Sequence, residues 1–243
     1  QNQSPWRIET PMTLLQDRTA DTDHPVLDVI AERWSTRVFD TDTPLDDAAL
    51  LGALEAARWA PSANNSQPWR FIVARRGSAP HASLVDALGG FNKAWARDAG
   101  ALVVFVAQTA REDGTPQRWA EYDTGQASAY FSLQAHASGL ATHQMGGFDD
   151  AAVARAFDLA ENLQPVTIIA VGTIGSYAGI SDELRRRESA PRTRRARARA
   201  RARASAARAP APDRLDRRAR ARRPRRTCSL ASRRTPSSAN SAP

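Results

Sequence analysis

The sequence predicts an α+β domain of three layers (α-β-α), in which helices cover both faces of one central mixed sheet. Helix and strand patterns are mixed along the chain, with more helix than strand. Residues 101–107 form a continuous apolar run, Ala-Leu-Val-Val-Phe-Val-Ala, which is typical of a strand buried on both faces. Residues 117–138 form the longest helical stretch, and apolar side chains nearly all round it indicate a central, buried helix.

Capping and helix-breaking residues place the other elements. Acidic residues are favoured at the start of a helix, where the helix dipole is positive, and a proline ends a helix. Gly139 is a natural end for the long helix over residues 117–138. In chain order we expect a short helix beginning near Asp23-His24-Pro25, a helix from Asp46-Asp47 to Pro61, strands near 70–75 and 101–107, a helix near 79–88 between them, and then the long helix, a strand near 140–144, a helix at 149–158 and a strand at 166–172.

Charge divides the chain into two parts. The 243 residues carry a net charge of +8, but residues 1–183 hold 13 basic and 23 acidic side chains, whereas residues 184–243 hold 21 basic and 3 acidic ones. Alternating arginine and alanine after Arg194 bury too little apolar surface to offset chain entropy. We therefore predict a domain over residues 23–195, a disordered tail over 196–243, and an N-terminal segment, 1–22, that is disordered or derives from upstream sequence.

Cysteine use and hydropathy narrow the class of protein. The only cysteine, Cys228, lies in the tail, which excludes an internal disulfide and a multi-cysteine metal site and fits a reducing cytoplasm. No apolar run approaches the length of a membrane span, and the first residues lack the order of a signal peptide, so we expect no membrane partner. His136, His143 and Asp149 have no spacing typical of metal ligands, and we expect no metal.

A polar loop, residues 60–69, joins the alanine-rich helix to the next strand. Two prolines fix their own φ angles, and serine, asparagine and glutamine side chains crowd the residues between them. Such a loop can be rigid and polar together. An ordinary helix-to-strand connection is the alternative, since serine and asparagine also favour turns for local reasons.

A basic segment, Arg33-Trp34-Ser35-Thr36-Arg37, follows the first predicted helix. If this segment is helical, its two arginines share one face and could bind an anion. A solvated basic end of a helix is the alternative for two arginines taken alone.

The basic segment and the polar loop precede Phe91-Asn92, Met145-Gly146-Gly147-Phe148-Asp149 and Ala190-Pro191-Arg192-Thr193-Arg194. In this order the set resembles the nitroreductase family of FMN-dependent oxidoreductases, over about residues 25–195. The resemblance implies a homodimer with FMN at the interface. It assigns to the cofactor site Arg33, Trp34, Ser35, Arg37, Pro61, Ser62, Asn65, Gln67, Asn92, Gly146, Gly147, Arg192 and Arg194.

The resemblance also implies a role for each group of residues. The arginines would neutralise the phosphate of FMN with Ser35 adding a hydroxyl contact, and Asn92 would meet the pyrimidine edge. The glycine pair would let the backbone approach the N5 edge, although a plain turn is the competing reading. The polar loop would reach the flavin of the second subunit.

An FMN enzyme of this family would pass hydride from NADH or NADPH through flavin N5 to a nitroaromatic, quinone or enone-like acceptor in a ping-pong cycle. No residue is indicated as an acid, base or nucleophile. Aromatic residues could wall the pocket, although aromatics at such spacings more often belong to a core. These candidates are Trp69, Phe91, Trp95, Trp119 and Tyr122.

Two alternatives stay open at this stage. A flavin protein of this type could catalyse another reaction, such as flavin fragmentation, dehalogenation or azoline oxidation. A nucleic-acid-binding protein could use the basic tail, although the acidic body and the lack of aromatic residues in the tail argue against more than non-specific binding.

The tail departs from the family pattern. After the arginine pair, family members usually continue with a proline and an apolar stretch that reaches over the partner subunit as a strand. Here arginine and alanine alternate instead. One hypothesis is a reading frame shifted near codon 194, which translation of the neighbouring frame would test. A genuine tail would weaken the dimer and FMN binding.

Overall fold

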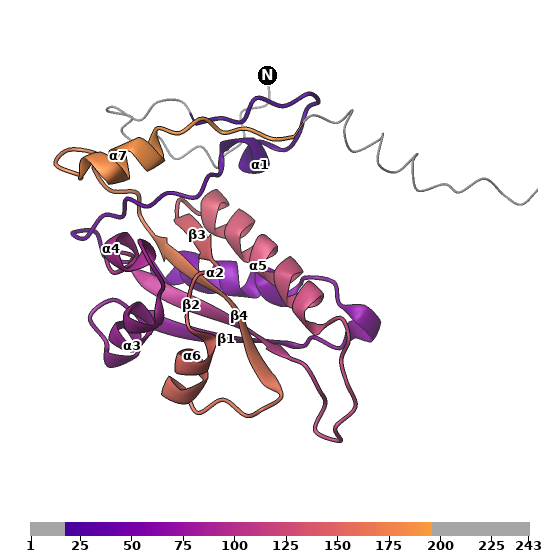
Figure 1. The fold of residues 1–243 in the computed structure, drawn as a ribbon. Helices are drawn as coiled ribbons and strands as arrows, with labels where there is room; N and C mark the ends of the chain where they lie inside the picture. Colours follow the sequence, from indigo (N-terminus) through magenta and orange to yellow (C-terminus); the bar gives the residue numbers. More distant parts are fainter. Residues whose placement is uncertain (1–17, 196–243) are drawn as a thin grey trace, which may run out of the picture. The chain divides into compact units, whose positions relative to one another are not determined.

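A computed structural model describes residues 18–195 of the chain (Figure 1). The chain divides into two compact units, Gln1–Thr193 and Arg194–Pro243, and the fold reported below is that of the first. The predictions for residues 1–17 and for the tail, 196–243, lie outside the described residues. No helix in the described range is long and apolar enough to cross a membrane.

The central sheet has four strands in the order β1-β2-β4-β3. Their bounds are Trp69–Arg75 for β1, Ala101–Gln108 for β2, Ala141–Met145 for β3 and Leu163–Gly172 for β4. Every pairing is antiparallel, so the expected mixed sheet is wrong for the described residues. The connections from β1 to β2 and from β3 to β4 return the chain to the end of the sheet it left; for example, the last residue of β1, Arg75, pairs with the first of β2, Ala101. Helix α5 (Ala120–Ala137) instead carries the chain to the opposite end between β2 and β3, but these two strands are not neighbours in the sheet.

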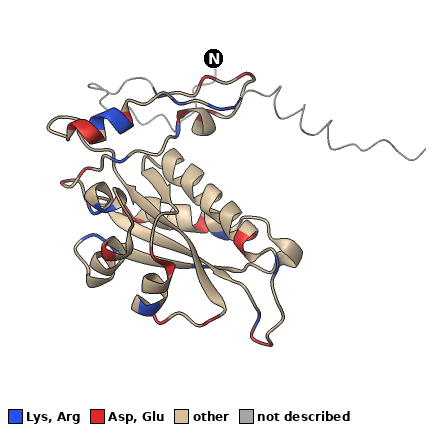
Figure 2. Cartoon of the chain, viewed as in Figure 1, with Lys and Arg blue, Asp and Glu red and all other residues tan. Residues whose placement is uncertain are grey.

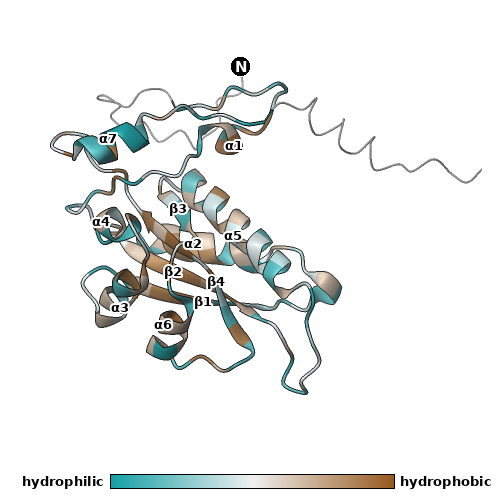
Figure 3. Ribbon diagram, in the orientation of Figure 1, coloured by the Kyte–Doolittle hydropathy of each residue, from teal (hydrophilic) through white to brown (hydrophobic). Residues whose placement is uncertain are grey.

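Seven helices occur in the described residues: α1 Asp28–Glu32, α2 Asp47–Arg58, α3 Ala79–Ala87, α4 Asn92–Ala96, α5 Ala120–Ala137, α6 Asp150–Ala156 and α7 Asp182–Glu188. Helices α2 and α5 cover one face of the sheet, and α3, α4 and α6 cover the other (Figure 1). The strands between these layers are the most hydrophobic part of the fold (Figure 3). The predicted three layers are therefore present.

Strand β2 shows why the sequence folds this way. Its alternate residues Val103 and Phe105 join the core under α2 and α5, whereas Leu102 and Val104 join the core under the other helices. A strand buried on both faces needs apolar residues at every position, which explains the continuous apolar run.

Local signals placed the longer helices well and the short ones poorly. The Asp46 carboxylate accepts from the amides of Ala48 and Ala49 at 2.8 and 3.3 Å and caps α2. Helix α1 begins later than expected, so Pro25 precedes it and Asp23 does not cap it. The short helices α4 and α7 were not predicted.

The chain beyond β4 packs closely on the segment before α2. Backbone hydrogen bonds join Asp40 N to Thr173 O at 2.9 Å and Gly175 N to Val38 O at 3.1 Å. A Cβ atom on Gly175 would lie 2.6 Å from Phe39 O, so only glycine fits this approach.

Candidate functional site

The basic segment is extended rather than helical. Helix α1 ends at Glu32, and Arg33 has φ −63° and ψ 130°. The arginines therefore do not share the face of a helix as the helical interpretation required.

The basic segment lies against strand β3 and helix α4. The Thr36 carbonyl lies 2.9 Å from Nδ1 of His143, and the His143 ring packs on the Trp95 ring with centroids 4.5 Å apart. Asn92 opens α4, and its Nδ2 makes a long 3.5 Å contact with the Gly147 carbonyl. Fold contacts thus bring the basic segment, Asn92 and Gly147 into one region.

Arg192 braces the backbone around Arg33. Its guanidinium donates to the carbonyl oxygens of Ala31 at 2.7 Å and Arg33 at 2.8 Å, and also to that of Arg18. These bonds tie the end of α1 to the chain beyond α7. Arg194 belongs to the second compact unit and is not placed relative to the other candidates.

A buried carboxylate fastens the basic segment from the other side. Glu188 accepts from the Arg37 amide at 2.9 Å, from Oγ1 of Thr36 at 3.1 Å and from the Tyr177 hydroxyl at 2.9 Å. The Arg37 guanidinium lies 3.5 Å from the same carboxylate. This network connects α7 directly to the predicted phosphate-binding residues.

Burial sets the protonation of two neighbouring groups. It lowers the pKa of His143 to about 4, and burial together with the Glu188 charge raises the pKa of Tyr177 to about 12. His143 is therefore neutral and Tyr177 keeps its proton at neutral pH.

Sequence reasoning missed Glu188. Glu188 ends the run Arg185-Arg186-Arg187-Glu188 in helix α7. Most residues of this helix are charged (blue and red in Figure 2), which is typical of a helix face exposed to solvent. No local signal distinguishes Glu188, whose side chain is 2% exposed, from Glu183 on the same helix, whose side chain is 35% exposed.

The polar loop contains a short 3₁₀ turn, Ala63–Asn65, with an unusual backbone. Asn64, Asn65 and Gln67 have φ angles of 53°, 53° and 50°, in the left-handed region. Within the loop, Asn65 N donates to Ser62 O at 3.0 Å and Gln67 N donates to Oγ of Ser62 at 3.1 Å. The loop is a defined structure rather than an irregular connection.

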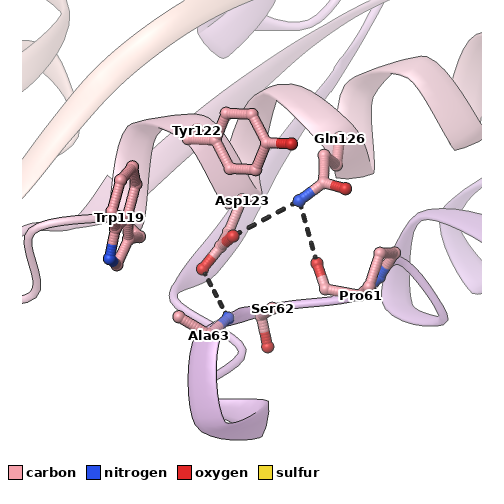
Figure 4. Close-up of a pocket in the computed structure, with 7 residues that line it drawn as sticks. All are labelled: Pro61, Ser62, Ala63, Trp119, Tyr122, Asp123 and Gln126. Carbon is pink, nitrogen blue, oxygen red and sulfur yellow. Dashed lines mark hydrogen bonds between the residues drawn. The ribbon is translucent and has the colours of Figure 1, made fainter. Parts of the chain in front are cut away.

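An open cavity of about 430 Å³ lies between the polar loop and the start of α5 (Figure 4). Its lining consists of Pro61, Ser62, Ala63, Trp119, Tyr122, Asp123 and Gln126. The Trp119 and Tyr122 rings are 51% and 64% exposed and meet edge to face, with centroids 6.2 Å apart. These two predicted wall residues thus line a real cavity.

The other aromatic candidates lie elsewhere. Trp69 and Trp95, 4% and 1% exposed, belong to the two cores, which is the alternative that the sequence favoured for aromatics at such spacings. Phe91 is partly buried, and the Arg187 guanidinium lies 4.5 Å from its ring centroid.

Two sets of candidates, the polar loop and the arginines Arg33 and Arg192, lie near opposite ends of α5 (the helix is labelled in Figure 1). Asp123, near the start of the helix, contacts Ala63 of the polar loop, whereas His136, near its end, interacts electrostatically with Glu32, Arg33 and Arg192. Thirteen residues of helix separate these contacts by about 20 Å. The polar loop and these two arginines are therefore far apart within one chain.

A second, largely apolar groove of about 230 Å³ runs between α1, α2 and α5. Val29, Ala56, Tyr130, Leu133, Gln134 and Ala137 line it. Large apolar side chains are exposed on the same helices, with Leu51 63% and Ile30 46% exposed.

Comparison with known proteins identifies related chains. A family model described as the nitroreductase family matches residues 30–173. An uncharacterized 15.4 kDa protein of Mycolicibacterium smegmatis is 35% identical over 132 residues, which cover 51% of this chain and 88% of that protein. An oxygen-insensitive NAD(P)H nitroreductase of Salmonella typhimurium is 35% identical over 95 residues, 38% of this chain and 44% of that protein.

A solved structure, described as an oxidoreductase containing FMN, is similar with a TM-score of 0.67 and 30% identity. The match covers 74% of this chain and 93% of the other.

Proposed function

Because the chain belongs to the nitroreductase family, whose model matches residues 30–173, we propose that it is an FMN enzyme that reduces small acceptors with NADH or NADPH. Nitroaromatics, quinones and enone-like compounds are the proposed acceptor class, and the cytoplasm is the proposed compartment. The observation that carries the proposal is that Thr36 of the basic segment contacts β3, while Asn92 contacts Gly147 just beyond β3, although these segments are far apart in sequence.

The residues present fit FMN. Two arginines suit a phosphate, and an amide suits a pyrimidine edge that both donates and accepts hydrogen bonds. Nε1 of Trp34, inside the basic segment, is buried and has no hydrogen-bond partner among the described residues. A buried donor of this kind needs an acceptor, and FMN offers phosphate and polyol oxygens.

The protein's part in the reaction is binding and orientation. When bound, FMN supplies hydride transfer at N5. Arg33 and Arg37 would hold the phosphate, Asn92 would orient the ring, and Gly147, which has no side chain, would leave the backbone open to close approach. Trp119 and Tyr122 would offer stacking surfaces that exclude water from an acceptor.

We also propose that two copies complete each site. The polar loop and the arginines lie near opposite ends of α5, so Pro61, Ser62, Asn65 and Gln67 would reach a flavin held by the arginines of a second copy. The apolar groove and its exposed neighbours offer the surface such a dimer would bury.

Flavin reconstitution tests the proposed function. The purified full chain is titrated with FMN, and we expect bound flavin absorbance, dimers by sedimentation, and NADH or NADPH oxidation that accelerates with a nitroaromatic acceptor. A chain that stays colourless after reconstitution would contradict the proposal. Bound flavin without NAD(P)H oxidation would favour one of the other flavin reactions instead.

Replacement of Arg33 by alanine should raise the Kd for FMN by roughly tenfold to a hundredfold, the value of a charge-assisted contact to phosphate. Riboflavin, which lacks the phosphate, should bind the variant and the parent equally. Quenching of flavin fluorescence measures both affinities. Arg155→Ala, at an exposed position on α6, is the control. Equal losses for FMN and riboflavin would assign Arg33 to the fold rather than to the phosphate.

A further inference from the structure

We infer that Asp123 and Gln126, on the first turns of α5, are positioning residues that hold the polar loop in its binding conformation. The inference rests on the proposed function, because it gives the loop a flavin to meet. Neither residue was predicted from the sequence. Both line the cavity between the loop and α5 (Figure 4).

The loop has a conformation that needs support. Three of its residues that are not glycine adopt left-handed φ angles within four positions. Asparagine tolerates this region better than most residues, but Gln67 has no such advantage. Backbone of this kind persists only where surrounding structure enforces it, and it is often found at ligand sites.

Two side chains of α5 supply that enforcement. Oδ2 of Asp123 accepts from the Ala63 amide at 3.0 Å. Nε2 of Gln126 donates to Oδ1 of Asp123 and to the Pro61 carbonyl, both at 3.3 Å. The pair therefore fastens Pro61 and Ala63, near the start of the loop, to a helix anchored in the core by Ala127 and Phe131.

The hydrogen bonds inside the loop cannot do this. Those from Asn65 and Gln67 to Ser62 shape the turn, but they join loop residues to one another. At the far end, Gln108 N donates to the Pro68 carbonyl at 2.7 Å and fixes only the entry to β1. The hydrogen bonds to Asp123 and Gln126 fix the position of the turn relative to Trp119 and Tyr122 on the other side of the cavity.

The burial of Asp123 supports a specific role. Asp123 is only 2% exposed. In the described structure its carboxylate accepts hydrogen bonds from two neutral amides, those of Ala63 and Gln126. Burying a carboxylate costs free energy, and the favourable interaction with the N-terminus of α5 does not by itself explain why Asp123 is buried. Glu121 holds a comparable first-turn position while exposed, and it provides a matched control.

Hydrogen exchange of the full chain without flavin tests the positioning directly. In Asp123→Ala, amides of residues 62–67 should exchange about tenfold faster, in keeping with the loss of a hydrogen bond to a charged group. Exchange in β2 and the end of α5 should not change. Asp123→Asn keeps an oxygen acceptor for Ala63 but turns its NH2 toward Nε2 of Gln126, so it should restore most, not all, of the slow exchange, while Glu121→Ala should match the parent chain. Gln126→Ala should also speed the exchange of these amides. This second variant still tests the inference if Asp123→Ala does not fold.

Flavin affinity and kinetics provide the second readout. Asp123→Ala should raise the Kd for FMN by about tenfold, and it should raise the KM for a nitroaromatic more than it lowers kcat, because a displaced loop weakens ground and transition states alike. Asp123→Asn should recover most of both losses.

The two readouts separate the inference from the proposed function. Unchanged loop exchange in Asp123→Ala and Gln126→Ala, or acceleration spread equally over β2 and α5, would overturn the positioning role. A parent chain that binds no FMN would contradict the proposed function, whereas the exchange result would still decide whether α5 holds the loop.

Discussion

Glu188→Ala is expected to lower the free energy of unfolding by about 3 kcal/mol, near the lower end for breaking a buried ion pair. The change would leave the Arg37 amide, the Thr36 hydroxyl and the Tyr177 hydroxyl without their acceptor. We take the lower end because the Arg37 side chain is 25% exposed and water would solvate its charge. Urea unfolding followed by circular dichroism measures the loss.

Glu183→Ala on the same helix is the matched control. Glu183 pairs with Arg186 and Arg187 near the surface, where water screens the charges, so its removal should cost much less stability than that of Glu188. Glu188→Gln should fall between the two, since its amide oxygen can still accept but carries no charge. Equal losses in Glu183→Ala and Glu188→Ala would show that the buried network adds nothing to an ordinary surface pair.

Acidification should destabilise the fold through His143. Its pKa is about 4 in the folded chain because burial disfavours the charged ring, against about 6.5 when unfolded. The folded pKa is the lower one, so the contribution to stability is complete above about pH 6.5 and is lost as the pH falls toward 4. The expected loss across that window is about 3 kcal/mol.

The comparison with His143→Gln isolates this contribution. A glutamine can donate to the Thr36 carbonyl but does not titrate, so the stability advantage of the parent should shrink as the pH falls from about 7.5 to 4. Burial also lowers the pKa of His81 and His136, but those groups are present in both chains and their effects cancel. A difference between the chains that is independent of pH would refute the assignment.

Local sequence was sufficient for much of the fold and for the family. The apolar run of β2, the acidic start of α2 and the glycine after α5 are signals carried by neighbouring residues, and the structure places elements where they indicate. The family resemblance rested on short motifs in order, and the family match confirms it. Burial on both faces of β2 follows from its composition alone.

Long-range packing decided the rest. Asp123 meets a loop 60 residues away, and Glu188 meets Thr36 from 152 residues away. Trp95 enters the core while Trp119 lines a cavity, although both are tryptophans in helical surroundings. Strand direction likewise depended on which end of the sheet each connection reached. A local pattern reports the propensity of a residue, whereas the burial and partners of a polar side chain depend on which distant segment packs against it.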